Sequence, residues 1–472
     1  MANFQNTNTH FDRSIVEGPI MKAIWKLAWP TMLQNMIAGF QGIVDHTMVG
    51  HIVGYTGNAA IGVSWQIFLV VVVFISSLFS GMNVLVARFA GAGDADKVNR
   101  VVYQSFLASV ILACGILAPA GYFLAPNLLD IVKAAPAVKA EALPYLRIMF
   151  VFSIGKLIFF MLGGALRTAG DAKTPLRLGV VMTVLNIIAN IILIPILGTR
   201  GAAIGTVFAT SSISIISLYW LFSGRLVVRF SKNMRWLPDW HIIGRLFKFG
   251  LPTGLQGIMV NVGGVMLLRF VGSLQQSAEA QAAFTVGYTQ LFSFITWTSV
   301  GLMGATAAVA GQNLGAGKPE RSSKTPKDAA KIGLTLASFI GLLFLMIPDK
   351  LYGIFGMNQP VVLGIGIELL KYLALSGLFI TVALAFTGGL QGTGDTRSPM
   401  YISLVAQIVV PIGICAVTQA FWGLEAQDIW LAIVLGHFTR CALTFVRFNQ
   451  GKWQYIKVEI REEKVRGGER VS

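Results

Sequence analysis

The chain has 472 residues, of which 55% are hydrophobic and only 12% are charged. Soluble domains carry about 25% charged residues, so a water-soluble globule of this length would lack the polar residues for its surface. Lipid is therefore the expected solvent. Membrane orientation explains the net charge of +16 better than nucleic acid does, because the basic residues lie mostly between apolar stretches.

Residues typical of metal sites and hydrolytic enzymes are sparse. Cys114, Cys415 and Cys441 stand alone without CxxC spacing, and the five histidines contain no HExxH motif. This pattern argues against a disulfide framework, a cysteine-rich metal site and zinc enzymes. We predict that the protein is not an enzyme.

Polar residues occupy positions 1–24, which have no apolar core and so do not form a cleaved secretory signal. Twelve apolar runs follow, each long enough to cross a bilayer: 25–49, 59–86, 101–125, 145–166, 178–198, 201–222, 247–271, 280–310, 331–348, 362–389, 400–420 and 428–446. Their length and lack of alternation favour helices over strands. The predicted fold is an all-α membrane protein with twelve transmembrane helices.

Basic residues alternate from loop to loop. Most of the 37 Lys and Arg residues lie in the termini and in the loops that join an even-numbered run to the next odd-numbered run. The positive-inside rule then predicts that both termini are cytoplasmic. The expected location is the cell membrane, which is the inner membrane in a Gram-negative cell.

The two halves of the chain repeat each other. Residues 164–176 read GALRTAGDAKTPL and residues 388–400 read GGLQGTGDTRSPM, at an offset of 224. At an offset of 222, Pro30, Gln34 and Gly50 recur as Pro252, Gln256 and Gly272. Because each half contains an even number of runs, the repeats share one orientation, as in one of the two transporter architectures.

The repeat predicts two pseudo-twofold-related six-helix bundles. The expected parts are a cytoplasmic N-terminal segment (1–24), an N-lobe of helices 1–6 (25–222), a cytoplasmic linker (223–246), a C-lobe of helices 7–12 (247–446) and a cytoplasmic tail (447–472). A cavity between such bundles, opened to each side in turn by rocking, would make the protein a carrier.

Asp45 is the clearest acid inside an apolar run. An Asp at a helix centre costs about 2.5–3.5 kcal/mol on insertion scales, and such charges usually serve function. Gln34 and Gln41 share its helix face, so we expect these amides to line a substrate cavity. Asp45 would exchange H⁺ or Na⁺ for substrate. The alternative is a carboxylate that snorkels from the helix end.

Further polar residues lie in the fourth, fifth and sixth runs. Asn186, Asn190 and Thr206 offer oxygen ligands for Na⁺ with Asp45, or hydrogen bonds to a protonated Asp45. The alternative is that they hold helices together. Lys156 is the basic residue placed nearest mid-bilayer, and we expect it in the cavity as counter-ion of Asp45. A snorkelling lysine is the alternative.

Two prolines lie near the starts of the first and seventh runs, at Pro30 and Pro252. Proline at such a position is compatible with helix initiation or with a functional kink. A kink would let one part of a helix swing while the other part stays packed.

Several motifs together resemble the multidrug and toxic compound extrusion (MATE) family. They read LAWP at 27–30, VDHTMVG at 44–50, VARFAGAG at 86–93, RTAGDAKTP at 167–175 and GQNLGAG at 311–317. The resemblance implies a twelve-helix, two-lobed exporter of organic cations or other amphipathic compounds, driven by inward H⁺ or Na⁺ through alternating access.

The resemblance also implies roles for single residues. Asp45 matches the coupling acid of the family's N-lobe, and Asn186 matches the first residue of its partner motif. Asn190 stands where the family usually has Asp. Acids are rare in the C-lobe helices, with Glu279 at an edge of the eighth and Glu368 at the start of the tenth, so the chain looks closer to the DinF-like branch than to the NorM-like branch.

Two alternatives remain open. A lipid-linked saccharide flippase of the same broad superfamily should place several Arg or Lys residues in the cavity, where the sequence offers Lys156 and Arg269. A non-transporting receptor or channel would not need the repeat. We expect small amphipathic or cationic substrates, a lipid bilayer around the protein, no nucleic-acid partner, a monomer, and no cofactor besides the coupling ion.

Overall fold

The computed structural model describes residues 11–231, 234 and 237–460, and the regular elements in this part of the chain are all helical. Residues 1–10 of the predicted N-terminal segment, 232–233 and 235–236 of the linker, and 461–472 of the tail lie outside the described residues. The N-terminal half contains α1 (Ser14–Glu17), α2 (Ile20–Ile52), α3 (Tyr55–Gly91), α4 (Ala95–Val110), α5 (Ala118–Ile131), α6 (Pro136–Val151), α7 (Ser153–Ala169), α8 (Lys173–Leu197) and α9 (Thr199–Phe222).

The C-terminal half begins earlier than the sequence predicts, because α10 already starts at Trp240. It contains α10 (Trp240–Val271), α11 (Ser277–Phe284), α12 (Ser293–Gly315), α13 (Pro319–Met346), α14 (Pro348–Ile354), α15 (Pro360–Thr393), α16 (Arg397–Leu404), α17 (Val410–Phe421) and α18 (Ala426–Asn449). The π-helical turns η1 (Ile111–Leu117), η2 (Thr285–Leu291) and η3 (Val405–Val409) join α4 to α5, α11 to α12 and α16 to α17. A 3₁₀ turn, η4 (Lys452–Tyr455), follows α18.

Nine helical runs among the described residues are long and apolar enough to cross a membrane, and ten if α6 and α7 count as one. The protein is therefore an all-helical membrane protein with many spans. Twelve spans additionally require α2 and α3, which contain 33 and 37 residues. At about 1.5 Å per residue, both are longer than the hydrocarbon core is thick.

The predicted run 145–166 is not one straight helix. Phe152 leaves the helical conformation with φ −102° and ψ 23°, and α6 and α7 meet there at an angle of 53°. The expectation of a single uninterrupted span was wrong in this respect, because an apolar run does not reveal a local break in the backbone. Lys156 consequently lies in the first turn of α7 rather than in the middle of a helix.

The repeated GD motifs end one helix and begin the next. Gly170 and Gly394 take φ values of 110° and 103°, which close the C-terminal turns of α7 and α15 and strongly favour glycine. One residue later, Asp171 accepts the backbone N–H of Thr174 at 3.0 Å, and Asp395 accepts that of Ser398 at 3.2 Å. The motifs are helix-capping turns in both halves.

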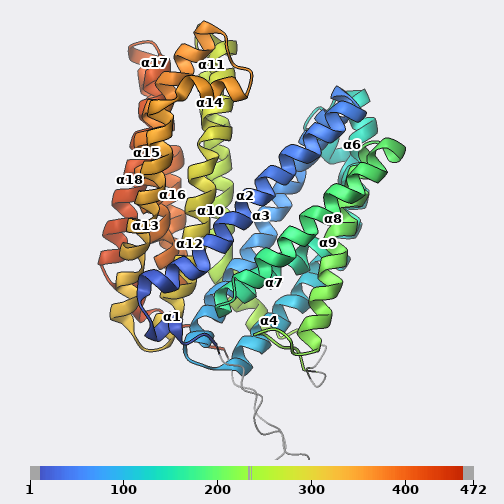
Figure 1. The fold of residues 1–472 in the computed structure, drawn as a ribbon, viewed down its shortest axis with the longest axis vertical. Helices are drawn as coiled ribbons and strands as arrows, with labels where there is room; N and C mark the ends of the chain where they lie inside the picture. The colour runs from blue at the N-terminus through green and yellow to red at the C-terminus, as the bar shows by residue number, and fades with distance from the viewer. Residues whose placement is uncertain (1–10, 232–233, 235–236, 461–472) are drawn as a thin grey trace, which may run out of the picture.

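The first long helix of each half starts in the core of the other half. The buried side chains of α2 from Ile20 to Met32 pack with α12, α13 and α15, whereas Val49 near its other end packs in the N-terminal half. The start of α10 packs on α3 in the same manner, and Val271 at its end packs in the C-terminal half. Figure 1 shows α2 rising from the base of the C-terminal bundle to the far end of the N-terminal bundle.

Pro30 and Pro252 lie inside these two crossing helices. Both α2 and α10 begin well before the predicted limits, at Ile20 and Trp240, so neither proline initiates a helix. A proline inside a helix has no N–H to donate to the carbonyl four residues earlier and weakens the helix at that point. Each proline therefore falls where its helix passes from one half to the other.

The two halves meet at one end, which we call the foot and which contains α1 and the loops after α3 and α12 (Figure 1). A Cβ on Gly91 would lie 1.9 Å from the carbonyl oxygen of Gln312, and one on Gly315 would lie 2.0 Å from that of Arg88. The Gln312 amide also donates to the carbonyl of Thr168 at 2.6 Å. Backbone-to-backbone contact thus joins the halves at the foot, whereas the bundles diverge at the other end.

Candidate ion and substrate site

From Val180 onwards, the polar side chains of helix α8 lie on one face. Asn186 and Asn190 are fully buried, whereas Val184, Ile188 and Ile191 are each at least half exposed. In lipid the outward side chains are apolar, and buried amides must find partners inside the bundle. The helix is thereby oriented with both asparagines towards α2 and α9.

A hydrogen-bonded network connects α2, α8 and α9. Asn190 Nδ2 donates to Asp45 Oδ1 at 2.8 Å, and Gln41 Nε2 donates to Asn186 Oδ1 at 3.0 Å. Asn186 Nδ2 donates to Thr206 Oγ1 at 3.2 Å, and the two asparagines are linked at 3.4 Å. The structure therefore brings together the residues predicted to couple the ion, and adds Gln41 to them.

One buried acceptor in this network has no partner. The carbonyl oxygen of Asn190 is buried and accepts no hydrogen bond from the described residues. Gly205 on α9 faces it, and a Cβ there would lie 2.2 Å from that oxygen. An unsatisfied buried acceptor is costly, so it marks a place where a cation or a proton donor fits.

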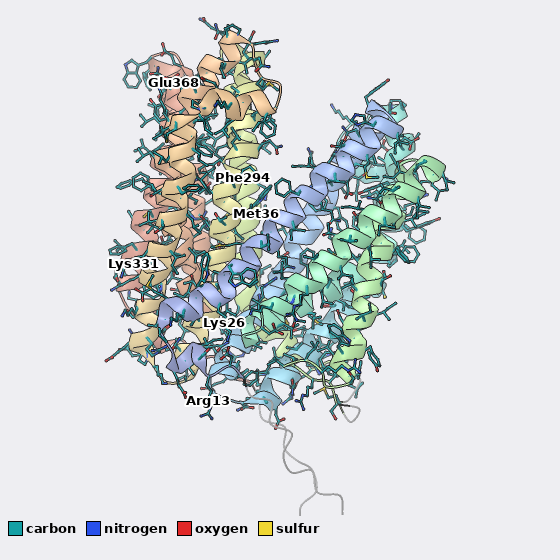
Figure 2. All side chains as sticks on the ribbon, in the orientation of Figure 1. Arg13, Lys26, Met36, Phe294, Lys331 and Glu368 are labelled. Carbon is teal, nitrogen blue, oxygen red and sulfur yellow. The ribbon has the colours of Figure 1, made fainter. Side chains whose placement is uncertain are left out.

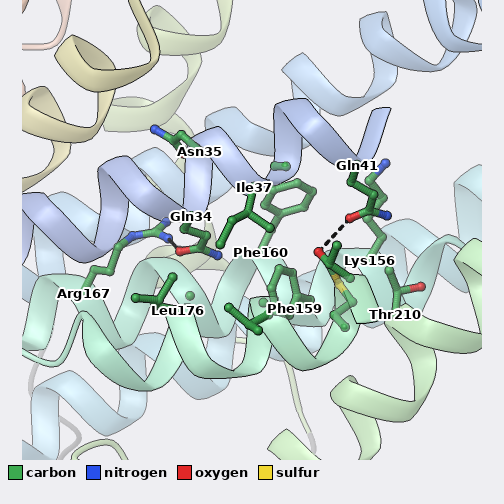
Figure 3. Close-up of a pocket in the computed structure, with 16 residues that line it drawn as sticks. Gln34, Asn35, Ile37, Gln41, Lys156, Phe159, Phe160, Arg167, Leu176 and Thr210 are labelled. Atoms are coloured by element: carbon green, nitrogen blue, oxygen red, sulfur yellow. Dashed lines mark hydrogen bonds between the residues drawn. The ribbon is translucent and has the colours of Figure 1, made fainter. Parts of the chain in front are cut away.

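A cavity of about 160 Å³ adjoins the network and opens between α2, α7 and α8. Its wall includes the predicted cavity residues Gln34, Gln41 and Lys156, together with Phe159 and Phe160 (Figure 3). Thr183 Oγ1 donates to Gln41 Oε1 at 3.0 Å, so the cavity wall and the ion network share one side chain.

The two cations of this cavity are held differently. The Lys156 ammonium lies 4.8 Å from the Trp65 ring centroid and 5.0 Å from that of Phe68, which are cation–π distances. Arg167 Nη1 donates to Gln34 Oε1 at 3.0 Å. Asp45 and Lys156 are close enough to interact electrostatically, but among the described residues no ion pair joins them.

Sequence reasoning missed two residues of this site. Arg167 falls just beyond the predicted run 145–166, yet it lies in the last turn of α7 and lines the cavity. Arg269, which the sequence offered as a second cation for the cavity, is exposed in the last turn of α10. Thr183 precedes Asn186 by three residues on the same helix face, so the spacing would have revealed it.

The C-terminal half has no equivalent acid. At the offset of 222, Leu267 takes the place of Asp45. Gln256, the counterpart of Gln34, instead donates to Ser403 Oγ at 3.0 Å and accepts from Gln391 at 2.9 Å. At this repeat position the C-terminal half therefore has neither the carboxylate nor the amide–carboxylate hydrogen bond of the N-terminal half.

Comparisons with known proteins cover nearly the whole chain. The MatE family model matches residues 30–192 and 252–417. A probable multidrug resistance protein NorM of Thermotoga maritima is 25% identical over 94% of this chain and 95% of its own length. A probable multidrug resistance protein YpnP of Bacillus subtilis is 26% identical over 94% and 98%.

Solved structures show the same fold. A MOP superfamily transporter from Pyrococcus furiosus, described as having a binding pocket of reverse polarity, superposes with a TM-score of 0.87 at 21% identity. An outward-facing multidrug resistance MATE family transporter gives the same TM-score and identity. In both cases the match covers 94% of this chain and 98% of the other.

Proposed function

Because the chain belongs to the MatE family, we propose that it is a secondary active multidrug exporter that exchanges H⁺ or Na⁺ for organic cations or other amphipathic compounds. Both similar sequences reported above carry names of multidrug resistance proteins. The observation that carries the proposal is the Asp45–Asn190–Asn186–Gln41 network, because it connects a partly buried carboxylate to a cavity wall.

Asp45, Asn186, Asn190 and Thr206 form the proposed coupling site. Each offers an oxygen atom, and hard cations such as Na⁺ prefer oxygen ligands. The free carbonyl oxygen of Asn190 supplies a ligand without breaking an existing hydrogen bond. A proton could also occupy the coupling site. A protonated Asp45 has an O–H group, and the carbonyl oxygen of Asn190 can accept a hydrogen bond from it.

Ion binding would reach the substrate through Gln41. Its amide nitrogen is bound to Asn186 and its amide oxygen to Thr183, so reorientation of Asn186 moves a side chain of the cavity wall. Substrate and ion then oppose each other in binding, which is what an antiporter requires. Alternating access would follow from rocking of the two halves about the foot.

Finer assignments are part of the same proposal. Helices α10 and α12 contain no acidic residue, and Glu279 lies in the first turn of α11, which supports a position nearer the DinF-like than the NorM-like branch. We also propose that the foot is cytoplasmic, because the basic loops belong to it, and that the protein works as a monomer in the cell membrane.

The direct test is efflux by purified protein in proteoliposomes under separately imposed H⁺ and Na⁺ gradients. Asp45→Asn keeps the shape of the side chain and removes its charge, so we expect it to abolish coupled export while leaving the melting temperature within a few degrees. Asp349→Asn, an acid of α14, is the matched control and should transport normally. Undiminished efflux by Asp45→Asn would refute the role of Asp45.

A second function has one observation in its favour. The lining of the cavity contains Lys156 and Arg167 and, among its described residues, no acid. This electrostatic balance suits an anionic amphiphile, such as a lipid-linked saccharide, better than an organic cation. Competition assays separate the two functions: an exporter of cations should be inhibited by a lipophilic cation, and a flippase by an isoprenoid phosphate.

A further inference from the structure

A basic pocket lies at the foot of the C-terminal half, between the starts of α10 and α16 and the chain after η4. It has a volume of about 390 Å³, and four cationic side chains line it: Arg245, Lys248, Arg397 and Lys457. Among the described residues, no ion pair engages any of these four. The acid in its lining, Asp395, is already bound by Arg447 through contacts of 3.0 and 2.8 Å.

The N-terminal half has a corresponding pocket, which contains a carboxylate side chain of the protein itself. Its lining contains Gly170, Asp171, Lys173 and Lys26, the counterparts of Gly394, Asp395, Arg397 and Lys248. There the carboxylate of Asp12 forms an ion pair with Lys26, which is labelled near the lower end of α2 in Figure 2. Burial acts to raise the pKa of Asp12, but hydrogen bonds from Lys26 and Ser14 outweigh it, and this pKa lies below its usual value.

Among the described residues, no acid takes the place of Asp12 in the basic pocket of the C-terminal half. The acid that precedes α10, Asp239, binds Arg100 at 2.6 Å and caps the helix. Glu459 in the tail does not line the pocket. Lys248 therefore shares the pocket lining with Arg245 and Lys457, whereas its counterpart Lys26 is paired with a carboxylate. Like charges in one pocket without an anion repel each other.

We propose that the basic pocket binds a phosphate group from outside the chain, carried by an anionic phospholipid headgroup or by a soluble phosphate compound. The side chains of Arg245 and Arg397 can bind phosphate oxygens in pairs, and Lys248 and Lys457 add point charges. The pocket lies at the end of the long apolar helices α10 and α15, where headgroups are found. The bound phosphate would join α10, α16 and the tail at the foot.

The test titrates the purified full chain in neutral detergent and follows its melting temperature. The probes are dioctanoyl phosphatidylglycerol, dioctanoyl phosphatidylcholine and inorganic phosphate. We expect wild-type protein to be stabilised by the first probe and not by the second. The double variant Lys248→Gln/Arg397→Gln should bind about tenfold more weakly or worse. The matched control, Lys324→Gln/Lys327→Gln, removes two exposed charges of α13 and should respond as wild type.

Each result supports or overturns the proposal. Stabilisation by phosphatidylglycerol alone identifies a lipid headgroup, and stabilisation by inorganic phosphate at similar concentration identifies a soluble ligand. Lys457→Glu, which replaces one of the four cations of the pocket by a carboxylate, should remove the response without lowering the basal melting temperature. Equal responses of the double variant and its control, or no response of the wild type to any probe, would overturn the site. Transport is not read in this test, so its failure is independent of the proposed export function.

Discussion

The carbonyl oxygen of Asn190 has room beside it because Gly205 has no side chain. The predicted function depended on residue types in apolar runs. The charge of Asp45 and the spacing of Asn186 and Asn190 singled out residues that the structure brings together in one hydrogen-bonded network. The free oxygen of Asn190 could not be predicted, because it depends on a contact between α8 and α9 that no pattern within one helix encodes.

Gly205→Ala should disable the coupling site with little effect on the fold. The added methyl group would lie 2.2 Å from Asn190 Oδ1 and force the amide away from its present position, at a cost of about 1–3 kcal/mol. We expect the half-saturating concentration of the coupling ion in proteoliposome efflux to rise about tenfold. Gly42→Ala on α2 is the control, since a Cβ there meets nothing within 4 Å. Equal ion dependence of both variants would contradict this description of the site.

Lys156→Met should tighten binding of the coupling cation. Its ammonium interacts with Asp45, and removing a positive charge near a cation site removes repulsion. The expected change is a fall of about three- to tenfold in the half-saturating ion concentration and a shifted pH profile of efflux. Lys156→Arg keeps the charge over the Trp65 and Phe68 rings and should stay close to wild type. An unchanged pH profile in Lys156→Met would remove Lys156 from the mechanism.

Helix limits were the least predictable feature at the scale of elements. Apolar runs mark the part of a helix that meets lipid, but α2 and α10 continue into polar sequence at the foot, where capping and packing rather than hydropathy decide their ends. This is why Pro30 and Pro252 seemed to lie at helix starts. The repeated GD and GAG motifs are structural turns, because Gly93, Gly170, Gly317 and Gly394 take positive φ values.

Gly315→Ala should weaken the contact between α3 and α12 at the foot. Its Cβ would lie 2.0 Å from the carbonyl of Arg88, so the two helices must separate. We expect Ala308→Cys, a reporter behind this contact in a background without native cysteines, to react several-fold faster with an impermeant maleimide. Gly304→Ala on the same helix meets nothing within 4 Å and is the control. Unchanged labelling would show that the glycine contact does not keep the foot closed.

Residues 452–460 join the two halves of the molecule across the foot, although the sequence analysis placed them in a cytoplasmic tail. Trp453 is buried against Phe448 in the C-terminal half, whereas Val458 and Ile460 are buried in the core of the N-terminal half. Arg88 on α3 also donates to the carbonyl of Ile456 at 3.3 Å. The predicted tail thus connects the two halves over residues 452–460.

Truncation after Gln450 should destabilise the protein, because it removes Trp453, Val458 and Ile460 from two apolar cores. Each fully buried apolar side chain contributes about 1.5–3 kcal/mol, so we expect a melting temperature several degrees lower in scanning fluorimetry. A chain that ends after Ile460 keeps every described contact of the tail and is the control. Identical melting curves for the two truncations would show that the tail does not hold the halves together.

The crossing of α2 and α10 has a consequence for how such a repeat could have arisen. A single half, made on its own, would leave the apolar start of its first helix uncovered and would lack the helix that completes its own bundle. Two separate copies would cover each other's apolar surfaces by exchanging these helices, as in a domain-swapped homodimer. Fusion of an ancestral gene with itself would then have preserved an interface that already existed, and two separately expressed halves of the present chain should assemble only when they are produced together.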